Sequence, residues 1–146
     1  MGRIIKLDGV GKQRNKMTRE VVLAIRELMQ QEDVNDLTKD LAAFISLTLL
    51  QIYQTIDITV AAWEKRDYWV KADRFRMDWA WSGTLAKDMR EALENDDRGS
   101  VAAISAQVAQ KLNKVHVPKR NRLGEPWHGA WDALKEQPFS VYPSSP

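Results

Sequence analysis

Apolar side chains recur every three to four positions along most of this chain, which is the spacing that gathers them on one face of an α-helix. The first such run follows Thr18, which suits the N-cap of a helix, and Glu20 lies where the helix dipole favours an anion. Val21 and Ile25 continue on one face. This pattern predicts a first helix from about residue 18 to the acidic cluster at 32–36.

The next two apolar runs are longer and predict a helical hairpin. Apolar residues keep helical spacing from Leu37 to Trp63, so a second helix is expected over 37–65, about 43 Å long at 1.5 Å per residue. The polar residues 65–67 interrupt the pattern, and a third helix is expected from there to about Asn95. The core face predicted for the third helix consists of Trp69, Ala72, Phe75, Trp79, Ala86, Met89 and Leu93.

Two shorter helices and a tail complete the predicted order. Ser100 suits the N-cap of a fourth helix, which must end near Pro118 because proline cannot continue a helix. A basic loop follows, and Pro126 suits the first position of a short amphipathic helix that reaches Leu134. The segment 137–146 holds three prolines and three serines, and we expect it to be mobile unless it docks.

Together these elements predict an all-α protein: an up-and-down helical bundle with a long antiparallel helix hairpin and a short C-terminal helix. We divide the chain into a basic N-terminal arm over 1–17, a helical bundle domain over 18–136 and a flexible tail over 137–146. Polar residues interrupt the apolar stretch 41–58, and no signal-like apolar run follows the N-terminal basic residues. We therefore expect a soluble, cytoplasmic protein that does not contact a membrane.

The charge is unevenly distributed although the net charge is only +2. Residues 1–26 carry seven basic and two acidic side chains, whereas residues 27–63 carry one basic and six acidic side chains. Residues 111–122 carry five basic side chains and no acidic one. The cationic charge is thus concentrated in two segments, one on each side of the central helices.

These two basic segments are the candidate binding residues, because Lys and Arg neutralise phosphates and release counterions. The candidates are Lys12, Arg14, Lys16, Arg19, Lys111, Lys114, Lys119, Arg120 and Arg122. The Trp127 ring lies close in sequence and could stack on a base. We expect a non-enzymatic binding module for nucleic acid or another polyanion. An acidic protein surface, including that of a homo-oligomer partner, and a purely solubilising role are the alternatives.

Six tryptophans in 146 residues suggest a second function. Trp79 and Trp81 are about 200° apart on a helix, so we expect that they do not face the same core. Trp81 then either docks on the short helix that bears Trp127 and Trp131 or lies exposed for a partner. The alternative function is therefore a structural or assembly protein, acting as a homo-oligomer or a small subunit through Trp81, Trp127 and Trp131.

Catalytic and cofactor chemistry finds little support in the sequence. The chain has no cysteine, so thiolate nucleophiles and Cys-ligated zinc are excluded. Glu125 and His128 have the Glu-x-x-His spacing of di-iron bundles, but no second such pair exists. Gly11 and Lys12 lack the rest of a phosphate-binding loop. We expect no enzyme activity and no cofactor.

Two stretches of the chain resemble other proteins. One joins residues 2–5 and 11–14 to the run Arg19–Leu28, and the other is the run Ala62–Met77. They resemble a group of uncharacterised proteins of Chloroflexi-type bacteria, and the resemblance covers most of the chain. It implies a bacterial cytoplasmic protein and assigns no site residue.

Overall fold

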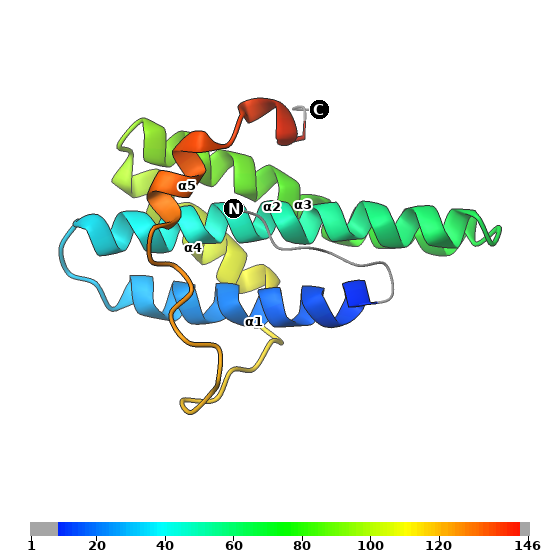
Figure 1. The fold of residues 1–146 in the computed structure, drawn as a ribbon, viewed down its shortest axis with the longest axis horizontal. Coiled ribbons are helices and arrows are strands. Elements are labelled where there is room, and N and C mark those ends of the chain that lie inside the picture. The colour runs from blue at the N-terminus through cyan, green and yellow to red at the C-terminus, as the bar shows by residue number, and fades with distance from the viewer. Residues whose placement is uncertain (1–8, 144–146) are drawn as a thin grey trace.

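The computed structural model describes residues 9–143, which form a helical bundle with no strand in that range (Figure 1). The helices are α1 (Val10–Met29), α2 (Asp36–Glu64), α3 (Trp69–Glu94), α4 (Arg98–Lys111) and α5 (Ala130–Glu136), and a short 3-10 helix spans Phe139–Val141. The predicted all-α bundle with a long hairpin and a short C-terminal helix is confirmed.

Helix α2 is the central element, because α1, α3 and α5 all pack against it. By length and composition alone α2 could cross a membrane, so the prediction from its polar interruptions stays a prediction. In the fold, 67% of its most apolar stretch of 18 residues is buried. The hydrophobicity of α2 is what a helix surrounded by three neighbours requires, since such a helix has no broad solvent face.

The hairpin of α2 and α3 extends beyond the first turn of α1 and carries its own small core (Figure 1). Ile56, Val60 and Ala72 are its buried residues, and Trp63 and Phe75 pack against them. The centres of these two rings lie 4.9 Å apart. The main core lies in the rest of the bundle, where all the helices contribute. The molecule is therefore a bundle with a protruding two-helix tip.

Helix α1 begins at Val10, eight residues earlier than predicted. Thr18 is not the N-cap but lies in mid-helix, where its hydroxyl donates to the Asn15 carbonyl at 2.8 Å. The earlier start arises because Val10 and Met17 are both buried and stand two helical turns apart. Residues 10–17 are thus not an extended arm, and residues 1–8 of the predicted arm lie outside the described residues.

The remaining helix ends also differ in detail from the prediction. Helix α4 is capped by Asp97, whose carboxylate accepts from the Ser100 backbone N–H at 3.1 Å, so Ser100 is not the N-cap. Helix α5 begins only at Ala130, after Gly129 in a left-handed conformation. Here the first predicted residues, from Pro126 onward, form turns instead.

The tail is docked as far as it is described. The Tyr142 side chain is buried, and its hydroxyl lies 3.1 Å from that of Ser46 on α2. Burial raises the pKa of Tyr142, so the phenol stays neutral near pH 7. The Arg90 guanidinium lies 4.2 Å from the centre of the Phe139 ring. Residues 137–143 therefore close the bundle over α2 and α3, and residues 144–146 lie outside the described residues.

Candidate nucleic-acid interface

The solvent face of α1 is cationic. Its opposite face is fixed in the core by Val10, Met17 and Val21, so the helical period directs the residues between them outward. Lys12, Lys16 and Arg19 are exposed along that outward face, about one helical turn apart. No acidic residue of α1 is exposed beside them, since Glu20 is buried and Glu27 is half-buried. The exposed strip of the helix therefore has a single sign of charge.

The basic loop between α4 and α5 is tied to α1. Arg26 Nη2 on α1 donates to the Val117 carbonyl at 2.7 Å, and the Val117 side chain is buried. At the other end of the loop, the Asp40 carboxylate on α2 accepts from the N–H groups of Gly129 at 3.1 Å and Trp131 at 2.9 Å. The loop is thus held at both ends against the first two helices.

Hydrogen bonds within the loop give its basic part a defined shape. The Asn121 side chain donates to the Pro118 carbonyl at 3.1 Å and accepts from the Leu123 N–H at 3.0 Å. The Leu123 side chain packs against the main core, which leaves the intervening residues outside. Lys119, Arg120 and Arg122 are all exposed.

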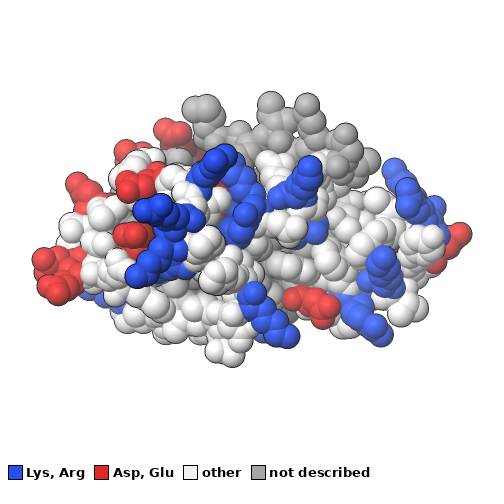
Figure 2. Space-filling view, turned by 90° about the horizontal axis from the view of Figure 1, so that it is seen from below, with Lys and Arg blue, Asp and Glu red and all other residues white. Residues whose placement is uncertain are grey.

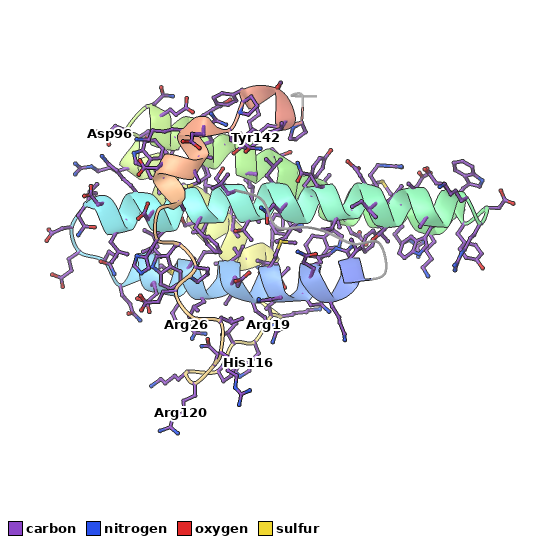
Figure 3. The ribbon with its side chains drawn as sticks, viewed as in Figure 1. Arg19, Arg26, Asp96, His116, Arg120 and Tyr142 are labelled. Atoms are coloured by element: carbon purple, nitrogen blue, oxygen red, sulfur yellow. The ribbon has the colours of Figure 1, made fainter. Side chains whose placement is uncertain are left out.

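The two basic segments consequently share one side of the molecule. Figure 3 shows Arg19 and Arg26 of α1 on the same side as His116 and Arg120 of the loop. Lys111 and Lys114, both exposed, lie where α4 ends and leads into this loop. Seen from that side, Lys and Arg spread from the middle of the face to its right end, and most visible Asp and Glu lie toward its left end (Figure 2).

One predicted binding residue, Arg14, is committed to the interior instead. Its guanidinium donates to Thr55 Oγ1 at 2.9 Å, to the Thr55 carbonyl at 3.2 Å and to Thr59 Oγ1 at 2.6 Å. It also lies 5.0 Å from the centre of the Phe75 ring. Burial lowers the pKa of Arg14, yet a guanidinium titrates so far above neutrality that it keeps its charge. Arg14 therefore joins α1 to the hairpin and does not belong to the cationic strip.

The tryptophans occupy different environments from those predicted. Trp127 is only 4% exposed and meets the Phe44 ring edge-on at 6.5 Å, so it offers no stacking surface to a base. Trp81 stacks on Trp79 at 5.8 Å, and both pack against the main core. The prediction that they could not face the same core is wrong, because long indole side chains reach around the helix flank. Trp131 is half-buried.

An exposed apolar tip was missed by the sequence reasoning. Trp69, predicted to face the core, is 55% exposed, and Val70 is 75% exposed. Tyr68 and Met77 are exposed as well. The reason is that α3 packs mainly against α2 at this end of the hairpin. The polar break at 65–67 was the signal, because a hairpin turn leaves the first residues of the next helix without neighbours.

The Glu125–His128 pair forms a contact without a metal-binding set around it. Glu125 Oε1 and His128 Nε2 lie 2.9 Å apart, and both side chains are exposed. Among residues 9–143 no group of three or more His, Cys, Asp or Glu side chains could hold a metal ion.

The fold and this surface define a helical bundle with one cationic side. The chain matches no protein-family model, no curated protein and no solved structure.

Proposed function

We propose that this protein is a non-enzymatic, cytoplasmic binding module whose cationic side contacts nucleic acid. The observation that carries the proposal is the hydrogen bond from Arg26 to the Val117 carbonyl at 2.7 Å. It brings together two basic segments that are far apart in the sequence, and adjoining cations can neutralise adjoining phosphates. The surface residues are Lys12, Lys16, Arg19, Lys111, Lys114, Lys119, Arg120 and Arg122.

The proposed contacts are to the phosphate backbone and not to the bases. Trp127, the ring predicted to stack on a base beside the basic loop, is buried. Lysine and arginine contacts to phosphates fix a position but read no sequence. Binding is therefore expected to depend steeply on salt and weakly on sequence, as it does for proteins that follow the backbone alone.

Fluorescence anisotropy with a labelled DNA duplex of about 20 base pairs tests the proposal through its salt dependence. Changing Lys119, Arg120 and Arg122 together to Gln is expected to lower the slope of log K against log salt by about 2–3. The matched control changes Lys65, Arg66 and Arg74 to Gln, which removes the same charge from exposed positions on the hairpin. Equal losses in both triple variants, or no binding by the native protein, would refute the proposal.

A second candidate function is assembly into a homo-oligomer or a larger complex. The observation in its favour is the exposed tip formed by Trp69, Val70 and Met77, since large apolar side chains are rarely left together in water without a partner. Sedimentation velocity at micromolar concentration tests the homo-oligomer form. A species larger than the monomer that disappears in Trp69→Ser supports it, and a monomer at every concentration contradicts it.

A further inference from the structure

An open apolar pocket of about 290 Å³ lies at the end of the bundle where α1 leads into α2 and α3 leads into α4. Apolar side chains from all four helices and from the first connection line it. These are Leu28, Met29, Val34, Ala42, Ala92, Leu93, Val101 and Ala102. A space of this volume admits one or two large apolar side chains.

The apolar surface continues outside the mouth of the pocket. Met29 is 62% exposed and Val34 is 45% exposed, and both belong to the lining. A methionine at such a position adapts its shape to different apolar groups. A small molecule inside the pocket would leave these two side chains in water, whereas a chain lying across the mouth would cover them.

The rim of the pocket is acidic. Its ionisable side chains comprise the four carboxylates Glu32, Asp33, Asp96 and Asp97 and the two cations Lys39 and Arg98. Hydrogen bonds from the Ser100 hydroxyl at 2.7 Å and its N–H at 3.1 Å lower the pKa of Asp97 and keep it ionised.

Part of this rim is held in place by the backbone. Asp96 adopts a left-handed conformation with φ 52°. In the same turn the Asp97 N–H donates to the Ala92 carbonyl at 2.8 Å. Figure 3 shows Asp96 and Arg120 on opposite sides of the bundle, so this part of the rim lies apart from the cationic side.

We infer that this pocket binds a basic amphipathic helix of a partner protein. The large apolar side chains of the partner helix enter the pocket and cover Met29 and Val34, while the Lys and Arg side chains of that helix meet the carboxylates of the rim. An apolar groove with a charged rim recognises such helices through apolar anchors spaced three to four residues apart. Opposite charges around the groove orient the helix and raise its association rate. The inference does not depend on the proposed function, because it uses none of the cationic residues.

Titration with two synthetic peptides tests this inference by calorimetry. Both peptides have about 14 residues with leucines at helical spacing; one carries lysines on the flanking positions and the other carries glutamates. The lysine peptide is expected to bind with micromolar affinity and the glutamate peptide at least tenfold more weakly. Equal binding of both, or no binding of the lysine peptide at millimolar concentration, would overturn the inference.

Two protein variants locate the binding. Ala102→Trp, a change at an exposed lining residue, fills the pocket and is expected to weaken the lysine peptide at least tenfold. Circular dichroism checks that the variant is folded, and Ala102→Met replaces it if it is not. The double change Asp33→Asn and Asp96→Asn is expected to weaken binding about 2- to 20-fold, since each exposed ion pair contributes little. Asparagine also tolerates the left-handed conformation at 96.

A matched control removes the same charge elsewhere. Asp57→Asn with Asp78→Asn changes two exposed carboxylates that do not line the pocket, so the affinity is expected to stay within twofold. Binding that Ala102→Trp leaves unchanged, or that the control weakens as much as the rim variant, contradicts the inference. Sedimentation velocity tests whether a second copy of this chain occupies the pocket instead. Self-association of the native protein that is lost in the rim variant would show this and would overturn the inference.

Discussion

At the scale of single residues, a basic side chain in the sequence carries no sign of whether it faces solvent or the interior. Arg14 and Lys16 stand two positions apart on α1 and looked equivalent as candidates. The structure separates them by about 200° around the helix, so Arg14 meets Thr55 while Lys16 is exposed. Burying a guanidinium requires hydrogen bonds to its N–H groups, which the two hydroxyls and the carbonyl of α2 supply.

We predict that Arg14→Ala affects the stability of the protein, whereas Lys16→Ala affects its binding to DNA. Arg14→Ala is expected to lower the free energy of unfolding by about 2 kcal/mol through its lost hydrogen bonds and ring contact, without changing the salt slope of DNA binding. Lys16→Ala is expected to change stability by less than about 0.5 kcal/mol and to lower the slope by about 1. Urea unfolding and anisotropy measure the two quantities. A stable Arg14→Ala variant with weakened binding would contradict the assignment.

A second residue-scale prediction concerns Gly83 on α3. Helix propensity alone counts it as a weak point, yet an added Cβ would lie 2.8 Å from Tyr53 Cδ1 and 2.9 Å from Pro143 Cγ. Gly83→Ala is therefore expected to destabilise the protein by about 1–2 kcal/mol, because overpacking exceeds the gain in propensity. Gly99→Ala, whose Cβ would approach no atom closer than 3.7 Å, is the control and should not destabilise. A Gly83→Ala variant with a higher melting temperature than the native protein would contradict the close approach of Tyr53 and Pro143 to Gly83.

At the scale of elements, the helix ends were harder to predict than the helices. The bounds of α2 and α3 follow from long apolar runs and agree closely with the prediction. The start of α1 does not, because Val10 and Met17 are seven positions apart with only polar residues and Gly11 between them. That spacing is helical but too sparse to stand out in a local window. Only the packing of both residues into the bundle reveals it.

Two helices are followed by an aspartate in a left-handed conformation, at a place in the chain where glycine is the usual residue. After α2, Asp67 has φ 63°, and the Tyr68 N–H donates to the Trp63 carbonyl at 3.0 Å. After α3, Asp96 takes the same position. Sequence reasoning predicted a turn over residues 96–100, but the connection spans residues 95–97 and α4 already begins at Arg98. It is also Asp96, and not Gly99, that adopts the left-handed conformation.

We predict that Asp67→Gly stabilises the protein by about 0.5–1 kcal/mol, because glycine adopts positive φ without a steric cost. Asp67→Ala keeps a Cβ and loses the polar side chain that aspartate uses to tolerate this conformation, so it is expected to be less stable than the native protein. Thermal unfolding of both variants gives the comparison. An Asp67→Gly variant that melts below the native protein would show that the aspartate carboxylate contributes more than the backbone strain costs.

At the scale of the whole molecule, the sequence indicated two basic segments but not their relative position. Their meeting depends on Arg26 and Val117, which are 91 residues apart in the chain, and on the anchoring of the loop by Asp40. No local pattern encodes such contacts. The same holds for the apolar pocket, because its lining comes from four helices and from the connections between them. The burial of Trp127 likewise follows from the docking of α5 on α2.

The central claim is that α1 and the loop act as one cationic surface, and the salt dependence of duplex binding tests it most directly. Three variants are compared with the native protein. The first changes Lys12, Lys16 and Arg19 to Gln, the second changes Lys119, Arg120 and Arg122 to Gln, and the third combines all six changes. Each triple variant is expected to lower the slope of log K against log salt by about 2–3, and the sixfold variant by about 5. A triple variant on either segment that leaves the slope unchanged would contradict the claim.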